Sequence, residues 1–401
     1  MLSPKLLIPV PVFAAVSCYL GYSHCNESLH QSTIPAVVSS SVFPFMEYSK
    51  VYFISLVFSF VTILLLQPYA EKLGLIDRPD GVRKIHLHDK PVIGGLGIVC
   101  GVLASIVLLL PFSPLAGFFM GILMIAVVGF FDDLYGVNFK IRFAVQAMSI
   151  VSIMYFGGTV LHSFGNIFGI GSLQTGFLAP VVTIFCVVGV INAMNMVDGL
   201  DGLAGSVSIV AFIAFGIFAG LNGQNELVYL SIAFIGAIAA FLRFNWYPSK
   251  LFMGDTGSMT LGFSLAFFAI QTTQGSAVVS PSAALLVLSL PVSDTIVVMI
   301  KRLMNGKHPF HADKTHLHHI LKDLGLSHKA AVIIMASASA VSSSIAIIGT
   351  MLHLPDYFFF TIYCCCLTAY FIASYKLKII YRLILQLRRN FPSFGPGRIS
   401  S

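Results

Sequence analysis

Long uncharged apolar runs alternate with short polar segments along most of this chain. An apolar helix of about 20 residues crosses a bilayer, and the continuity of these runs favours helices over the alternating strands of a barrel. The pattern therefore predicts an all-α polytopic membrane protein with about eleven transmembrane helices and active-site loops on one side. The predicted spans are residues 50–69, 92–111, 114–131, 141–158, 177–194, 203–221, 226–243, 256–273, 281–300, 330–351 and 356–375.

The spans divide the chain into three parts. Residues 46–375 form the integral membrane domain and residues 376–401 form a basic tail. Residues 1–45 fit the pattern poorly, because Lys5 followed by a short apolar run is typical of a signal-peptide core. An extra span is an equal alternative, and a chain that truly begins at Met46 is the interpretation we favour.

Charge is scarce and lies on one side of the predicted bundle. With 57% hydrophobic and 10% charged residues, the chain has too little charge to cover a soluble surface. If the spans alternate, 21 of the 23 Lys and Arg residues fall on one side, in segments 70–91, 132–142, 243–255, 301–329 and 376–401. The positive-inside rule makes that side cytoplasmic. The net charge of +7 suits an anionic partner, although anionic lipid headgroups in the bilayer would suffice.

The densest polar cluster follows an apolar run, in the sequence NAMNMVDGLDGLAG at 192–205. Ionisable groups beside hydrocarbon are costly and are functional candidates by default. Its members have a spacing of three, and each such step turns by about 60° around a helix. Glycines at 199 and 202 therefore predict that the helix ends there, which lets the last two members turn back into a shared site. The members are Asn192, Asn195, Asp198 and Asp201; a capped, hydrated helix end is the alternative.

Carboxylates also stand at the ends of two other predicted spans. Asp132 and Asp133 could bind Mg²⁺, or one could act as a base, but adjacent side chains diverge on a helix and should not share one ion. A solvated helix end is the alternative. Asp255 alone would be interpreted as an N-cap. Together with the Asn/Asp cluster on the same side, a metal ligand is favoured.

Histidines and cations gather in HADKTHLHH. His316, His318 and His319 suggest zinc, but no further ligand has suitable spacing. The carboxylates elsewhere favour hard Mg²⁺ or Mn²⁺. With Lys314 and Arg302 nearby, the histidines better suit phosphate oxygens.

Three further residues have open interpretations. Arg83 and Lys84 precede a Gly-Gly pair, so they could bind an anion or simply set topology. Asp294 lies inside a predicted span, where it would hydrogen-bond within the bundle or serve the site. The seven cysteines have neither metal nor disulfide spacing and are interpreted as structural.

Residues 46–390 resemble the polyprenyl-phosphate N-acetylhexosamine-1-phosphate transferases. Four motifs occur in that family's order: DDLYG, NAMNMVDGLDGLAG, FNWYPSKLFMGDTGS and HADKTHLHH. The HLHH form resembles the branch that starts O-antigen, enterobacterial common antigen or teichoic-acid chains. One departure is Gly136, where the acidic motif of the family often has a third carboxylate.

The resemblance implies a reaction at the cytoplasmic face of the bacterial inner membrane. Undecaprenyl phosphate attacks the β-phosphorus of a UDP-N-acetylhexosamine and releases UMP. GlcNAc is the favoured sugar, Mg²⁺ the favoured ion with Mn²⁺ as the alternative, and no nucleic acid is expected. Whether the bundle forms a homodimer is left open.

The resemblance also implies roles for the residues. Asn195 and Asp255 would hold the metal, and Asp132 or Asp133 would orient or deprotonate the lipid phosphate. His316, His318 and His319 would bind phosphate or sugar in the transition state. The remaining substrate-binding candidates are Arg83, Lys84, Asn192, Asp198, Gly199, Leu200, Asp201, Asn245 and Phe252.

Two other classes compete with this interpretation. A transporter or flippase of lipid-linked sugars would show broken helices and charges at the membrane midplane, often in inverted repeats. An intramembrane zinc hydrolase would use HLHH as its ligands. The polar groups cluster at one face instead, and this favours the transferase.

Overall fold

A computed structural model describes residues 35–78, 89–109, 112–276, 278–306, 308 and 316–390 of the chain. For residues 35–45, 112–114 and 377–390 it describes the backbone alone. Arg83, Lys84 and Lys314 lie outside the described residues, as do residues 1–34 and the end of the basic tail. The predictions made for them therefore stay predictions.

Helices form most of the described structure. Each predicted span coincides with one helix, except residues 281–300, which form two. The helices are α2 (Pro35–Leu66), α3 (Gly94–Leu109), α4 (Phe112–Tyr135), α5 (Phe139–Gly157), α6 (Ala179–Val197), α7 (Leu203–Leu221), α8 (Asn225–Asn245), α9 (Gly254–Gln271), α10 (Pro281–Val287), α11 (Ser289–Met304), α12 (Leu317–Asp323), α13 (His328–Met351) and α14 (Asp356–Asn390).

The non-helical elements are small. Strands β1 (Ile76–Asp77) and β2 (Lys90–Pro91) pair antiparallel, with Ile76 opposite Pro91. Two short 3₁₀ turns, η2 (Gln67–Tyr69) and η3 (Gly176–Leu178), border helices α2 and α6. The strand pair brings the start of α3 beside the loop that precedes α9, since Phe252 N donates to Pro91 O at 2.8 Å.

The chain is a multi-pass membrane protein by the length and composition of its helices. Among the described residues, eight helices can cross a bilayer, or nine if α10 and α11, which meet at a bend of 79°, count as one span. Helix α3 is shorter, with 16 residues. Helix α9 has 18 residues, but its first two turns carry Asp255, Thr256, Ser258 and Thr260. The predicted number of eleven spans therefore stays a prediction.

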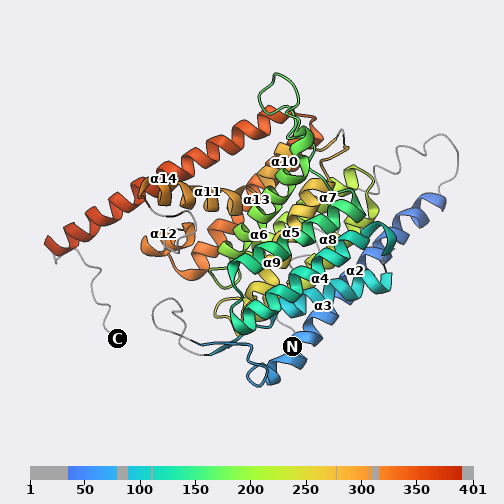
Figure 1. The fold of residues 1–401 in the computed structure, drawn as a ribbon, viewed down its shortest axis with the longest axis horizontal. Helices are drawn as coiled ribbons and strands as arrows, with labels where there is room; N and C mark the ends of the chain where they lie inside the picture. The colour runs from blue at the N-terminus through green and yellow to red at the C-terminus, as the bar shows by residue number, and fades with distance from the viewer. Residues whose placement is uncertain are drawn as a thin grey trace.

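Helix α9 lies at the centre of the bundle (Figure 1). It packs against α3, α4, α6 and α7. Glycines permit close approach: a Cβ at Gly95 would lie 2.2 Å from Gly257 N, and one at Gly129 would lie 2.5 Å from the Cα of Thr256. The polar first turns of α9 are thereby buried between neighbouring helices rather than exposed to lipid.

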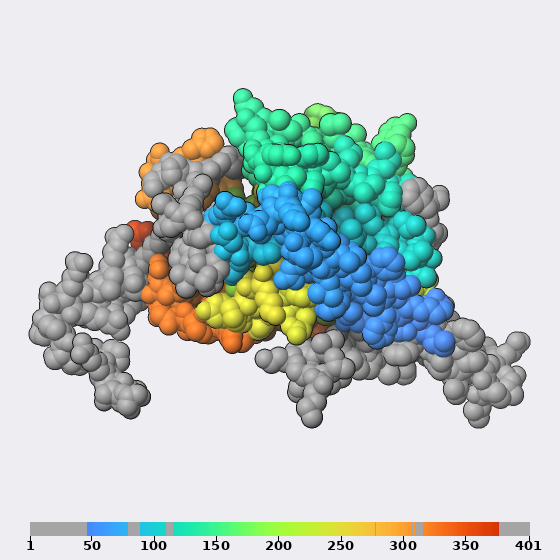
Figure 2. All heavy atoms as spheres, turned by 90° about the horizontal axis from the view of Figure 1, so that it is seen from below, coloured from blue at the N-terminus to red at the C-terminus, as the bar shows by residue number. Residues whose placement is uncertain are grey.

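Helices from both halves of the chain pack against each other. The hydroxyls of Ser55 and Ser59 in α2 donate to the carbonyls of Ala233 and Ala237 in α8. Figure 2 shows the blue surface of α2 against a yellow surface from the second half of the chain. Helix α14, with 35 residues, lies along the edge opposite α2 (Figure 1).

Candidate active site

The polar clusters meet at one end of the bundle, as their sequence positions predicted. The C-terminal ends of α4, α6 and α8 lie at the same end as the N-terminal ends of α5 and α9. Helix α6 ends at Val197, and a turn through Gly202 leads into α7. The prediction that the helix ends near these glycines is confirmed. The site is therefore assembled from five helix ends.

Asp133 caps the first turn of α9 from the neighbouring helix α4. Its carboxylate accepts hydrogen bonds from Asp255 N at 2.7 Å, from Thr256 N at 3.0 Å and from the Thr256 hydroxyl at 2.6 Å. Asp255 itself lies inside this first turn, so its interpretation as the N-cap was wrong. The Asp255 carboxylate is thus available for another task.

Gly254 makes this capping arrangement possible. Its φ is +75°, and a Cβ there would lie 2.7 Å from both carboxylate oxygens of Asp133. A side chain would therefore strain the backbone and displace the cap at the same time.

Arg142 of α5 joins two of the carboxylates. Its guanidinium forms an ion pair with Asp132 and lies 3.3 Å from Asp255. Asp132 also accepts from Val137 N at 2.6 Å. Asp132 and Asp133 thus have different partners, as expected for adjacent side chains on a helix. Arg142 was not among the site residues predicted from the sequence, although a cation in the first turns of an apolar helix was a usable signal.

Asn195 brings the cluster on α6 to α9. Its side-chain amide donates to Asp255 Oδ1 at 2.5 Å and to the Ser258 hydroxyl at 2.9 Å. Asn192 does not join this contact, because its amide donates to Val188 O at 2.7 Å within α6 and approaches Gln146 of α5. Asn195 and Asp255 therefore present two oxygen-bearing groups at one point.

The site has an excess of negative charge. Burial, and then the neighbouring carboxylates Asp132 and Asp133, raise the pKa of Asp255 to about 7. Burial and the charges of Asp255, Asp133 and Asp201 raise the pKa of Asp198 well above its usual value. Carboxylates at close quarters disfavour one another's ionised form unless a cation lies among them.

These donors fit a hard divalent cation better than zinc. Among the described residues, no three His, Cys, Asp or Glu side chains are arranged as a metal site. The zinc-hydrolase interpretation thus gains no support from this part of the chain. Mg²⁺ needs fewer protein ligands, because it is commonly bound by one or two carboxylates and completes its coordination shell with substrate phosphates and water. Asp255 and Asn195 suit that mode.

The turn after α6 is held by the loop that follows α8. Asn245 is buried, accepts from Gly202 N at 2.8 Å and donates to Leu251 O at 2.9 Å. Asp201 accepts from Ser249 N at 3.0 Å, and Leu200 is buried. In this structure the side chains of Asn245 and Asp201 fix the backbone of the predicted nucleotide site.

Lys90 contributes a cation beside this turn. Its ammonium lies 3.8 Å from Asp201 Oδ2 and 4.7 Å above the centre of the Phe252 ring. It also donates to the Ser249 hydroxyl at 2.7 Å. Phe252 is thus part of the same corner as Asp201, and the assignment of both residues to nucleotide binding stays a prediction.

The histidines reach the turn after α6 from α12. The His318 ring packs on Gly199, where a Cβ would lie 2.6 Å from the imidazole. Burial and neighbouring charged groups lower the pKa of His318 to about 3, so this ring is neutral at physiological pH. The ring of His319 lies 4.2 Å from that of His318, centre to centre.

His316 is held by a residue of the bent span. Its Nδ1 lies 2.8 Å from Asp294 Oδ2, and Asp294 is almost fully buried. The prediction that Asp294 hydrogen-bonds within the bundle is confirmed. The histidine group thus belongs to the same end of the bundle as the carboxylates.

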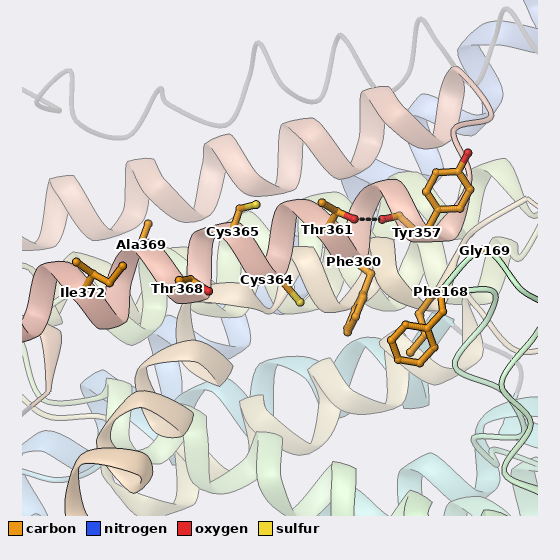
Figure 3. Close-up of a pocket in the computed structure, with 11 residues that line it drawn as sticks. Phe168, Gly169, Tyr357, Phe360, Thr361, Cys364, Cys365, Thr368, Ala369 and Ile372 are labelled. Carbon is orange, nitrogen blue, oxygen red and sulfur yellow. Dashed lines mark hydrogen bonds between the residues drawn. The ribbon is translucent and has the colours of Figure 1, made fainter. Parts of the chain in front are cut away.

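A surface hollow begins at the opposite end of α6 from the carboxylate cluster and runs along α14. It has a volume of about 1050 Å³ and is lined by the loop at 167–169 and one side of α14, from Tyr357 to Ile372 (Figure 3). That loop precedes the N-terminal end of α6, whereas the polar cluster lies at its C-terminal end. A helix of 19 residues separates the two by about 28 Å.

The bundle and the carboxylate cluster at one of its ends define a multi-pass membrane protein whose candidate chemistry lies at one end of its helices. The model of glycosyl transferase family 4 matches residues 115–273, from α4 to α9. These residues include the carboxylate cluster but not the histidines.

Similarity to curated proteins extends further. The undecaprenyl-phosphate alpha-N-acetylglucosaminyl 1-phosphate transferase of Escherichia coli K12 is 33% identical over 350 residues, which are 83% of this chain and 94% of the relative. The protein of the same name from Pasteurella multocida is 31% identical over 338 residues, 82% and 94% of the two chains. The one from Haemophilus influenzae is 30% identical over 348 residues, 84% and 96%. This chain belongs to glycosyl transferase family 4.

Proposed function

We propose that this protein transfers N-acetylglucosamine 1-phosphate from UDP-N-acetylglucosamine to undecaprenyl phosphate and releases UMP. The single observation that carries the proposal is the contact of Asn195 with Asp255 inside a carboxylate cluster at one end of a membrane bundle. The names of the relatives support the choice of lipid and sugar. Membership of a glycosyl transferase family does not favour a transporter.

The proposed reaction is an in-line phosphoryl transfer. An oxygen of the lipid phosphate forms a bond to the β-phosphorus of the UDP-sugar. The bond from that phosphorus to the oxygen bridging the α-phosphate breaks, and UMP leaves with that oxygen. A bound divalent cation, Mg²⁺ or Mn²⁺, would offset the negative charge that develops on the diphosphate.

Different residues would bind the cation and orient the lipid phosphate. Asn195 and Asp255 would hold the cation. Arg142, between Asp132 and Asp255, would orient these carboxylates and attract the lipid phosphate. Because much of a phosphate monoester is already dianionic at neutral pH, with a second pKa of about 6, a positioning role for Asp132 is favoured over proton abstraction.

The second half of the site would bind the rest of the substrates. The turn from Asp198 to Gly202, braced by Asn245, would receive the uridine, with Phe252 beside it. His318 and His319 would donate hydrogen bonds to phosphate or sugar oxygens as charge develops, and His316 would contact the same groups through Nε2. Arg83 and Lys84 are proposed to bind phosphate groups of the same substrates.

We further propose that this end of the bundle faces the cytosol across the bacterial inner membrane. The concentration of Lys and Arg in segments predicted to share that side supports the orientation. The product would then begin a cell-envelope polysaccharide, since the HLHH form resembles the branch that starts such chains.

The test is a transfer assay with purified protein. UDP-sugars labelled in the sugar, with GlcNAc and GalNAc as the two arms, are offered with undecaprenyl phosphate and Mg²⁺. We expect label to enter the organic phase with one UMP released per sugar, and GlcNAc to be preferred. Lack of UMP and of labelled lipid with every UDP-sugar would overturn the proposal.

A further inference from the structure

We infer that Asp294 and Tyr370 are positioning residues that hold His316 in its working orientation, an inference that rests on the proposed function. The three side chains come from α11, α14 and the segment just before α12. They are 22 to 76 residues apart along the chain. Neither Asp294 nor Tyr370 belongs to the four motifs that carry the resemblance.

One buried carboxylate receives three donors. Asp294 Oδ2 lies 2.8 Å from His316 Nδ1, and Oδ1 accepts from Leu317 N at 2.9 Å and from the Tyr370 hydroxyl at 2.5 Å. Asp294 is 1% exposed. Every bond that it accepts leads to the histidine segment or to α14.

Burying a carboxylate inside a membrane bundle is costly, so Asp294 is a functional candidate by default. The buried face of α11 is mixed. It carries Ser293, Asp294, Lys301 and Arg302 beside Val297 and Val298, whereas Leu303 and Met304 are exposed. The helix therefore presents several polar groups to the protein in addition to apolar ones.

The contact with Asp294 determines which nitrogen of His316 is left free. A carboxylate accepts hydrogen bonds and donates none, so Nδ1 must carry the proton. Nε2 is then the atom turned away from Asp294. Buried partners of this kind orient an imidazole and set its tautomer.

His316 is placed near the predicted nucleotide turn. Its ring is nearly parallel to that of His318, with centres 5.8 Å apart, and His318 packs on Gly199. Helix α11 itself adjoins the end of α6, where the Thr295 hydroxyl lies 3.9 Å from the sulfur of Met196. Support from Asp294 thus reaches a histidine beside the site.

The alternative is that Asp294 only anchors α12 through Leu317 N. A double-mutant cycle between Asp294 and His316 distinguishes a role in positioning His316 from a role in anchoring α12. Asp294→Asn keeps the size of the side chain and an acceptor for Leu317 N, but removes the charge that faces Nδ1. Tyr370→Phe removes one hydroxyl and is the second variant if Asp294→Asn does not fold.

We expect Asp294→Asn to lower kcat by about 10- to 100-fold and Tyr370→Phe by a smaller factor, with KM for the UDP-sugar within about threefold. In a His316→Ala background, either substitution should change kcat by less than about twofold. Val297→Ala is the control, because Val297 is fully buried one turn further along α11. It should lower Tm while kcat per folded molecule stays within about twofold.

Two results would overturn the inference. One is an equal loss of kcat from Asp294→Asn with and without His316, which would mark an anchor that acts independently of the histidine. The other is a loss of kcat from Val297→Ala as large as that from Asp294→Asn. Failure of the proposed function is distinguishable, because the wild-type protein would then release no UMP.

Discussion

Asp133 at the end of α4 and Asp255 at the start of α9 are both partly buried carboxylates, but their surroundings give them different tasks. The oxygens of Asp133 are used by two backbone amides and a hydroxyl. Asp255 meets Asn195 and Arg142 and is crowded by two other carboxylates. A carboxyl group whose pKa is raised by neighbouring carboxylates is a better candidate for cation binding than one whose oxygens already accept hydrogen bonds.

The protonation state of Asp255 is expected to make the stability of the protein depend on pH and on the bound cation. Its pKa of about 7 in the folded protein lies above the usual carboxyl value, so the folded state favours the protonated form. The stabilisation is present at low pH and is lost as pH rises through about 7. We expect the Tm of cation-free protein to fall as pH rises from about 4 to about 7 and to level off above that, and Mg²⁺ to raise Tm more at pH 8 than at pH 5.

The substitution Asp255→Asn tests whether the charge of this carboxylate binds the cation. It should reduce transfer at saturating Mg²⁺ by at least about 100-fold while the protein still folds and inserts, because it removes ligand charge rather than packing. It should also abolish the pH-dependent gain in Tm with Mg²⁺, measured by thermal unfolding in detergent. Near-wild-type turnover in this variant would contradict the metal assignment.

His318 is predicted to serve catalysis more than folding. With a pKa of about 3, it is neutral at working pH and acts through hydrogen bonds rather than charge. His318→Ala should lower kcat by about 10- to 1000-fold, as expected for the loss of a transition-state donor, and lower Tm by only a few degrees. Steady-state kinetics and thermal unfolding check this. A large fall in Tm with kcat retained would mark His318 as structural.

At the scale of elements, the site depends on caps and close contacts between helices rather than on any one helix. The sequence pattern located the helices and predicted where α6 ends, because apolar runs and glycines are local signals. The N-cap that it offered as an alternative for Asp255 was wrong, because the capping carboxylate, Asp133, lies 122 residues away from Asp255 along the chain. The sequence pattern also missed the pairing of Arg142 with Asp132, because tertiary contacts leave little trace in local periodicity.

The cap of α9 can be tested through stability. Asp133→Ala removes the acceptors for two backbone amides and a hydroxyl, and should lower the free energy of unfolding by about 1–3 kcal/mol. Asp133→Asn keeps one acceptor and should cost less. Asp89, whose side chain is 54% exposed, supplies the control: Asp89→Asn should change stability by less than about 0.5 kcal/mol. Equal Tm values for all three variants would contradict the cap.

The contact between α12 and the turn after α6 can be tested with a pair of glycines. A Cβ at Gly199 would overlap the His318 ring, whereas one at Gly189, on α6 itself, would have no atom within 4 Å. Gly199→Ala should displace the histidine and lower kcat by about tenfold or more. Gly189→Ala should leave kcat and Tm essentially unchanged. Equal kinetics for the two variants would show that the histidine does not need this contact.

At the scale of the whole molecule, the architecture suits a meeting between a lipid and a soluble nucleotide sugar. Five helix ends converge on the polar cluster, and α9 carries its polar turns into the centre of the bundle. The alternation of predicted spans across the membrane was enough to predict that the polar clusters share one end of the bundle. It could not predict the bend of 79° between α10 and α11, because a continuous apolar run contains no signal for its direction.

The remaining whole-molecule prediction concerns orientation, because a cytosolic nucleotide sugar requires the polar end to face the cytosol. In a cysteine-free background, Lys322→Cys places one thiol on α12 beside the histidines, and Gln174→Cys places one in the loop at the opposite end of α6; both positions are exposed. In intact spheroplasts, a membrane-impermeant maleimide should label residue 174 but reach residue 322 only after permeabilisation. The reverse pattern would contradict the cytoplasmic assignment. Labelling of both from outside would contradict the bundle topology itself, since α6 could not then cross the membrane between them.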